Sequence, residues 1–189
     1  MKKLLITLFI LIVGLGCFAA GDEGLRDYNG VQLAKGTFIP VISAQELSTQ
    51  YCDEGNQAKF ISTTDLYLYE SIVIPSNTEF YGYIEKINEP IVGTNASMII
   101  KITKLRFIDG YELPVRGYVY ANNSPIIGGE LTEPESYVKK PSYRQGFKMA
   151  YGWVPGPSRK MGEHKVIASG ADLLIILSAP VYITHTVNN

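Results

Sequence analysis

The sequence predicts an all-β protein that forms a single, partly open β-barrel of antiparallel hairpins. The chain contains 13 Tyr and seven Phe, which favour strands, together with 18 Gly and ten Pro, which favour turns. Several stretches alternate apolar and polar residues with the period of a half-buried strand. Pro-Ser-Asn-Thr and Asp-Gly sequences stand between such stretches and are typical of tight turns. The 189 residues suffice for one domain with a substantial core.

The amino end predicts a secretory signal peptide over residues 1–19. Lys2 and Lys3 precede an apolar run over residues 4–13, and small residues follow, with cleavage expected after Ala19. Alternatively, Cys17 becomes a lipidated amino terminus. Gly14 stands where the lipoprotein pattern has Leu or Val, so soluble export is favoured. We therefore expect an exported protein of the periplasm or cell envelope, or an outer-membrane lipoprotein if Cys17 is lipidated.

The charge balance gives no basis for nucleic-acid binding. Without Lys2 and Lys3, 15 basic residues remain against 18 acidic ones. Cys52 would be the single cysteine left after cleavage at Ala19, so no internal disulfide is expected. We interpret Cys52 as a partly buried thiol, with pairing to another chain as the alternative. Membrane contact is expected only if Cys17 is lipidated.

A flexible, glycine-rich lead-in over residues 20–30 is expected to precede the barrel domain, which spans residues 31–187. Residues 31–41 predict a strand with a kink at Gly36, ended by Pro40. Ser43 and Glu46 have the spacing of a helix capping box, which could start a short helical turn.

The next stretch predicts the central hairpin of the barrel. Residues 59–74 alternate in part, with a tyrosine-rich polar face. Pro75 begins a turn that leads into an alternating strand containing Gly82. A glycine inside a strand is typical of a sharp bend, so residues 72–82, which first suggest a hairpin, are better described as a barrel corner.

The remaining regular elements are a second hairpin and a buried closing strand. Residues 97–108 and 112–121 are two strands joined by Asp109-Gly110, both of which accept a positive φ. Residues 173–177 form a continuous aliphatic run, which is typical of a strand buried on both faces.

Residues 122–165 predict one long irregular loop, with a possible short helix over residues 145–151. Loops of this length are often functional. Its aromatic and basic residues invite comparison with surfaces that bind nucleic acids or lipids, but the net negative chain and export signal favour a solvated surface loop over that interpretation. Docking of a protein partner lies between the two, because Tyr, Trp and Arg anchor interfaces. The candidate docking residues are Tyr137, Tyr143, Arg144, Phe147, Tyr151 and Trp153.

The sequence contains no catalytic or metal-binding pattern that we can identify. His164 and His185 lack further ligands at metal-binding spacing, so neither a metal nor another cofactor is predicted. No nucleophile elbow or phosphate-binding loop occurs. We therefore favour a non-enzymatic role. The alternative is a secreted carbohydrate-binding or hydrolytic β-protein with a cleft beside the long loop, where two carboxylates would converge.

Several turn motifs occur in an order that resembles a known family. They are Lys35-Gly-Thr-Phe-Ile-Pro40, the Pro75 to Thr78 turn with Gly82 after it, a strand ending in Asp109-Gly110, and Gly170 before an aliphatic strand. This order resembles the periplasmic β-barrel domain of the TrbI-like scaffold proteins of conjugation and type IV secretion channels. The resemblance covers about two thirds of the exported chain and implies a barrel fold and an envelope setting.

The chain also departs from that family. TrbI-like proteins have an inner-membrane helix and a proline-rich spacer before the barrel, and they insert apolar antenna helices into it. Residues 122–165 are too rich in Pro, Gly and Lys to form such helices. We therefore expect a structural or interaction module, accessory to a secretion or conjugation assembly, that contacts other envelope proteins or further copies of itself.

Overall fold

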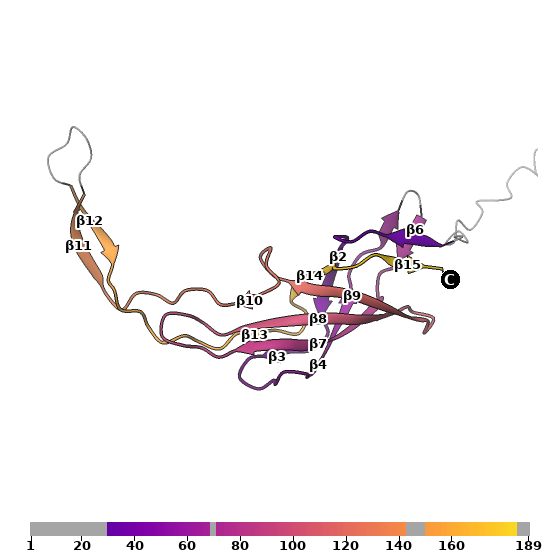
Figure 1. Ribbon diagram of the computed structural model, residues 1–189, viewed down its shortest axis with the longest axis horizontal. Helices are drawn as coiled ribbons and strands as arrows, with labels where there is room; N and C mark the ends of the chain where they lie inside the picture. Colours follow the sequence, from indigo (N-terminus) through magenta and orange to yellow (C-terminus); the bar gives the residue numbers. More distant parts are fainter. Residues whose placement is uncertain (1–29, 69–70, 143–149, 185–189) are drawn as a thin grey trace, which may run out of the picture.

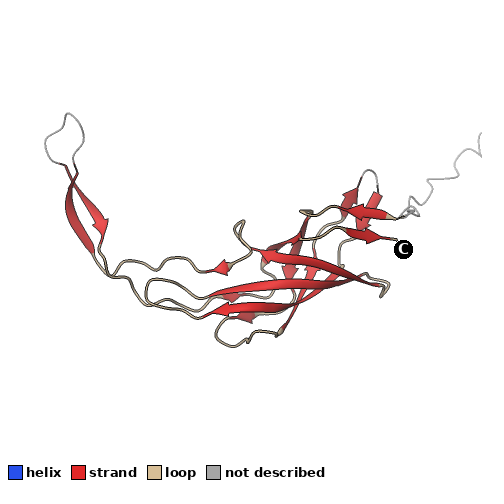
Figure 2. Ribbon diagram, in the orientation of Figure 1, coloured by secondary structure: helices blue, strands red, loops and turns tan. Residues whose placement is uncertain are grey.

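The computed structural model describes residues 30–68, 71–142 and 150–184. Figure 2 shows that the described chain consists of strands and loops, without a helix. Residues 1–19, for which a signal peptide is expected, most of the expected lead-in, and Cys17 lie outside the described residues. The strands are β1 (Val31–Leu33), β2 (Phe38–Ser43), β3 (Leu47–Ser48), β4 (Gln57–Ser62), β5 (Leu66–Leu68), β6 (Ser71–Ile74), β7 (Glu79–Asn88), β8 (Ser97–Arg106), β9 (Glu112–Tyr120), β10 (Ile127–Gly128), β11 (Tyr137–Ser142), β12 (Ala150–Pro155), β13 (Val166–Ile167), β14 (Asp172–Leu177) and β15 (Val181–Ile183).

Six antiparallel strands form a closed barrel. Their order is β8-β7-β4-β2-β14-β9, and β9 pairs back with β8. The short strand β10 pairs with the amino-terminal end of β8, where Ile127 lies opposite Met98. The all-β barrel is thus confirmed, but the barrel closes completely instead of remaining partly open. Closure pairs the backbone of all six strands on both sides and removes the sheet edges.

Alternation along the strands places one set of side chains in the barrel interior. In β7, Phe80 and Ile84 are fully buried, whereas Tyr81 and Tyr83 between them face outward and are partly exposed. Period-two alternation requires this arrangement when one face of a sheet is packed and the other is solvated. Other fully buried core side chains are Phe60, Met98, Ile100, Ile102, Leu105, Val119 and Ile175.

The barrel depends on a close backbone approach at Gly82. A Cβ atom at this position would lie 2.1 Å from the carbonyl oxygen of Lys101 on β8. The β7–β8 register shifts between Tyr81 and Gly82, so the glycine lies at a bulge. Bulges bend a strand and increase its twist, as closure of a small barrel requires.

Small pairs of strands lie at the ends of the barrel. β1 pairs with β15, β5 with β6, and β3 with β13. In Figure 1, β15 and β6 lie at the end of the molecule opposite β11 and β12. The first and last described strands, β1 and β15, thus lie side by side as an antiparallel pair.

Several local expectations are corrected. The chain does not kink within one strand at Gly36: Gly36, with φ 87°, turns between β1 and β2, which belong to different sheets. Pro40 does not end its strand but lies inside β2 opposite Leu174. Ser43 starts no helical turn, because its hydroxyl donates to the Gln45 carbonyl and the chain continues into β3.

Residues 72–82 form a corner instead of a hairpin. β6 pairs with β5, whereas β7 pairs with β4 and β8. Between them, the backbone N–H and the hydroxyl of Thr78 both donate to the Pro75 carbonyl. The β5–β6 pair thus lies in the sequence between β4 and β7, which pair with each other in the barrel. By contrast, β8 and β9 form the expected hairpin around Asp109-Gly110, and β14 lies between β2 and β9 in the sheet. β14 is not buried on both faces, however, because only Ile175 and Leu177 are buried and the residues between and before them are partly exposed.

Residues 122–165 form an extended arm and not an irregular loop. Beyond β10, the chain runs out along the loop between β7 and β8, forms the β11–β12 hairpin, and returns (Figure 1). We call residues 89–96, 129–136 and 156–165 the stem, and β11 with β12 the distal hairpin. Residues 143–149 lie outside the described residues, as do Tyr143, Arg144, Phe147 and most of the possible helix over 145–151. The last two residues of that helix, Ala150 and Tyr151, are in β12.

Substituting Gly82 with Ala should destabilise the barrel by about 2–3 kcal/mol, because the new methyl group would overlap a backbone carbonyl that cannot move without breaking the β7–β8 ladder. Thermal or urea denaturation measures the loss. Gly152→Ala is the matched control, since a Cβ atom at that position would have no other atom within 4 Å. Equal stabilities for the two variants would contradict the role assigned to Gly82.

The projecting arm as a candidate interaction site

The stem is held together by backbone hydrogen bonds between three segments far apart in the sequence. The Gly93 N–H donates to the Lys160 carbonyl at 3.0 Å, and the Thr132 N–H donates to the Gly93 carbonyl at 3.1 Å. The hydroxyl of Thr132 donates to the Lys160 carbonyl at 2.8 Å. The loop between β7 and β8 thus forms hydrogen bonds with both the outgoing segment, residues 129–136, and the returning segment, residues 156–165.

Glycines allow the stem chains to approach closely. A Cβ atom on Gly162 would lie 2.0 Å from the Thr94 carbonyl oxygen, and one on Gly156 would lie 2.9 Å from that of Ser136. The Gly162 N–H donates to the Ile91 carbonyl at 3.0 Å. Any larger side chain at Gly162 would separate the segments that these bonds join.

Ion pairs neutralise carboxylates along the stem. Lys160 lies 2.9 Å from Glu133, and Lys165 lies 3.3 Å from Glu130. The hydrogen bond from Lys160 holds the pKa of Glu133 below its usual range. For Glu130, a backbone hydrogen bond within the residue is the largest cause of the lowered pKa, followed among favourable contacts by Lys165.

The distal hairpin has two faces of different chemistry. Residues directly opposite in an antiparallel pair point to the same face. Tyr137 lies opposite Pro155, Lys139 opposite Trp153, and Pro141 opposite Tyr151; we call the surface made by these six residues the aromatic face. The Lys139 ammonium lies 5.1 Å from the centre of the Tyr151 ring, within the range of a cation–π contact. The opposite face carries Val138, Val154 and Lys140.

Large apolar side chains are exposed along the whole arm. In the distal hairpin, Trp153 retains 69% of its accessible surface. In the stem, Leu131 retains 71% and Val92 retains 69%, and Val92 lies opposite the exposed Met161. Contiguous exposed apolar surface on a soluble protein commonly marks a site of interaction. Further exposed apolar residues of the arm are Ile91, Ile126, Tyr137, Val138 and Tyr151.

The outer face of the barrel carries tyrosines that contact neighbouring ion pairs. Tyr81 lies between two ammonium groups, with Lys59 at 5.5 Å and Lys104 at 5.0 Å from the ring centre. Glu79 accepts hydrogen bonds from Lys59, at 2.6 Å, and from the Tyr81 hydroxyl. The hydrogen bond from Lys59 is the largest cause of a lowered Glu79 pKa, and its counterpart raises the pKa of Lys59.

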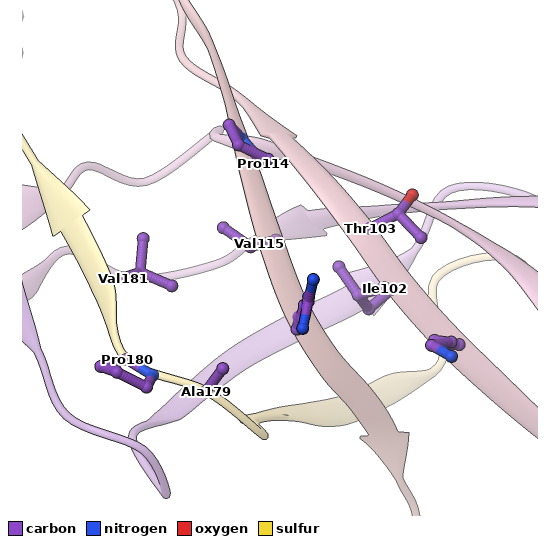
Figure 3. A pocket seen from close by; sticks show the side chains of 9 residues that line it. Ile102, Thr103, Pro114, Val115, Ala179, Pro180 and Val181 are labelled. Atoms are coloured by element: carbon purple, nitrogen blue, oxygen red, sulfur yellow. The ribbon is translucent and has the colours of Figure 1, made fainter.

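A hollow of about 710 Å³ lies where β8 and β9 meet the segment before β15. Figure 3 shows Ile102, Val115 and Val181 around it, with Ala179 and Pro180 at its side. Lys101 and Arg116 are the charged residues of its lining, which contains no carboxylate. The lining therefore lacks the paired carboxyls that glycoside hydrolysis requires.

A smaller hollow of about 280 Å³ lies beside the stem and contains two carboxylates, Glu133 and Glu163. A glycosidase needs one carboxyl with a raised pKa to act as the general acid. Lys160 has the opposite effect on Glu133, because their hydrogen bond lowers the Glu133 pKa. The hydrolytic alternative thus gains no support from this hollow.

The described residues contain no cluster of three or more His, Cys, Asp or Glu side chains suited to a metal ion. His164 is exposed, and its Nδ1 lies 3.2 Å from the Thr49 hydroxyl; His185 lies outside the described residues. Cys52 is a partly buried free thiol. Within residues 30–68, 71–142 and 150–184, there is also no helix long and apolar enough to cross a bilayer.

The structure brings three of the six candidate docking residues onto one surface. Tyr137, Tyr151 and Trp153 share the aromatic face of the distal hairpin, and each is more than half exposed. Sequence reasoning missed the stem residues Val92, Leu131 and Met161. These residues are exposed because of pairings between segments far apart in the sequence, which no local sequence pattern predicts. The one local indication is the pair of apolar residues, Ile91 and Val92, between Pro90 and Gly93.

Comparisons with known proteins found no family model that matches the chain and no curated protein that matches it. Several solved structures are similar to it. One of them is ComB10 of the Com type IV secretion system of Helicobacter pylori. It is 12% identical and covers 80% of this chain and 90% of that chain, with a TM-score of 0.47. At this TM-score, no conclusion about function follows from the likeness.

Substituting Glu79 with Gln should reduce stability by about 0.5–1 kcal/mol at neutral pH, a value typical of a partly exposed ion pair. Because the folded-state pKa of Glu79 is lowered, its contribution is fully present above the ordinary glutamate range and is lost as the pH falls through the lowered value. Urea denaturation at several pH values measures this. Glu89→Gln, at an exposed carboxylate with no ion pair among the described residues, is the control. A difference from wild type that persists in strong acid would contradict the assignment.

Substituting Gly162 with Ala should loosen the stem while leaving the barrel intact, because the new methyl group meets the Thr94 carbonyl. Hydrogen exchange should show faster exchange at the amides of Gly93, Thr132 and Gly162, with unchanged protection in β7 and β8. Gly152→Ala in the distal hairpin is the control. Unchanged exchange in the stem would show that Gly162 does not hold the segments together.

Proposed function

We propose that this protein is an exported, non-enzymatic interaction module of a bacterial envelope, and that the arm is its docking element. The observation that carries the proposal is the exposed apolar surface of the arm, which is built on a rigid closed barrel. Binding elements are commonly loops positioned by such a scaffold. The stem residues Val92, Leu131 and Met161 contact a protein component or a second copy. Tyr137, Tyr151 and Trp153 contribute to the same attachment.

Membership of the TrbI-like family and an accessory role in a secretion or conjugation assembly are part of this proposal. They are supported by the positions of the motifs in the fold. Gly36-Thr37 precedes β2, the Pro75 turn leads into β7, Asp109-Gly110 joins β8 to β9, and Gly170 precedes β14. The proposed export rests on the signal-like residues 1–19, with lipidation of Cys17 as the alternative route to the envelope.

A photoreactive amino acid at Val92 or Met161 should crosslink the full-length protein to another envelope protein or to a second copy in intact cells. The physical reason is that both side chains are exposed and would be buried only by a partner. Denaturing gels followed by mass spectrometry identify the product.

Phe38 and Tyr182 are the matched control positions, since they are 59% and 61% exposed on the barrel and on β15. The proposal predicts products that depend on the arm positions. A strictly monomeric protein on native gels, with equal or no crosslinking at all four positions, would contradict it.

A further inference from the structure

The distal hairpin exposes aromatic and basic side chains, and its own sequence contains no carboxylate. Residues 137–155 contain four of the 17 basic residues of the chain and none of its 18 acidic ones. The rest of the chain therefore carries 13 basic residues against 18 acidic ones. A local charge asymmetry of this kind indicates an anionic partner.

Two carboxylates of the stem, Glu130 and Glu133, form ion pairs with lysines of the stem, Lys165 and Lys160. The stem also contains Glu89, Glu135 and Glu163, and among the described residues none of them forms an ion pair with a lysine of the distal hairpin. Lys139 and Lys140 are exposed on opposite faces of the hairpin, and the described structure shows no ion pair for either. Their charge is thus available to a partner.

The aromatic face has the chemistry of a bilayer interface. Trp and Tyr gather at the headgroup level of membranes because their rings are apolar and their N–H or O–H groups are polar. Tyr137, Tyr151 and Trp153 lie on one face, and Lys139 lies on the same face, next to Tyr137 on β11 and opposite Trp153 on β12. A lysine in such a position can extend its ammonium to lipid phosphates while its stem stays on apolar surface.

The hairpin also has the shape that shallow insertion requires. Six-residue strands span about 20 Å. Among the described strands, β11 pairs with β12 alone, and these two strands lie at the end of the arm, away from the barrel (Figure 1). Shallow burial of one face needs only about 5–10 Å of depth. A protein groove can also hold aromatic anchors, but the combination of Trp, Tyr and Lys on one face of a narrow projecting ribbon matches the chemistry of a bilayer interface.

We infer that the aromatic face of the distal hairpin binds the surface of a membrane rich in anionic phospholipid. The site consists of Tyr137, Lys139, Tyr151 and Trp153, with Lys140 contributing charge. This provides a membrane contact that is independent of Cys17. The inference rests on the proposed function in one respect, that the arm is the docking element. It does not require a partner protein.

The single tryptophan of the chain provides a specific test, because Trp153 reports on the hairpin alone. Its fluorescence in the full-length protein should shift to shorter wavelength, and become protected from acrylamide, on addition of phosphatidylglycerol-containing vesicles. Pure phosphatidylcholine vesicles should produce a much weaker effect. The double variant Lys139→Gln/Lys140→Gln should bind about 30-fold more weakly, at about fivefold for each lysine. High salt should also weaken binding, because it screens the headgroup charge.

The matched control is Lys35→Gln/Lys86→Gln, which removes the same charge at two exposed lysines outside the distal hairpin. Its vesicle affinity should equal that of the wild type. Unfolding curves for both double variants establish that each is folded. Brominated acyl chains should quench Trp153 if the ring reaches the bilayer.

Three results would overturn the inference: no Trp153 shift with anionic vesicles, equal weakening by the two double variants, or an equal shift with soluble polyglutamate. The last would identify the partner as an acidic protein. Crosslinking at Val92 and Met161 is measured independently of lipid. If the protein crosslinks but does not bind vesicles, the membrane inference alone is refuted. If it binds vesicles but does not crosslink, the proposed protein partner is refuted.

Discussion

Pairing of β8 on both of its sides is the constraint on which the rest of the structure depends. β8 forms ladders with β7 and with β9, so it closes the barrel, and it also carries β10 where the arm leaves the barrel. The β7 ladder can form only because Gly82 lets the two backbones approach. The same strand therefore connects the packed interior to the projecting stem, and the orientation of the arm depends on the barrel register.

Elements specified by nearby residues were predictable from the sequence. The β8–β9 hairpin follows from alternation around Asp109-Gly110, and the position of β14 within the sheet, between two partners, follows from its aliphatic run. The partners of β6 and β7 were not predictable, because the turn at Pro75 is compatible with either a hairpin or a corner. Ser43 has a capping-box sequence, but strand pairing on both sides of it overrides that local preference.

The candidate site was predictable only in part, for a related reason. Aromatic and basic composition indicated Tyr137, Tyr151 and Trp153 as surface residues with a binding role. The stem was missed because its hydrogen bonds join residues about 30 to 70 positions apart, such as Gly93 with Lys160 and Thr132 with Gly93. Pro and Gly in residues 122–165 suggested irregular structure. In fact, Gly156 and Gly162 are sites of close chain contact.

The path of the chain between the two ends gives the molecule a mechanical property. β7, β8 and β9 run along the longest axis, with the distal hairpin at one end and β15 at the other (Figure 1). The chain that joins these two ends is residues 156–180, which include β13 and β14, so tension between the ends would load the ladders of β14 with β2 and β9. Resistance to such tension is set by the rate of unfolding. The pairing of β14 on both of its sides thus sets how firmly the two ends of the molecule are joined.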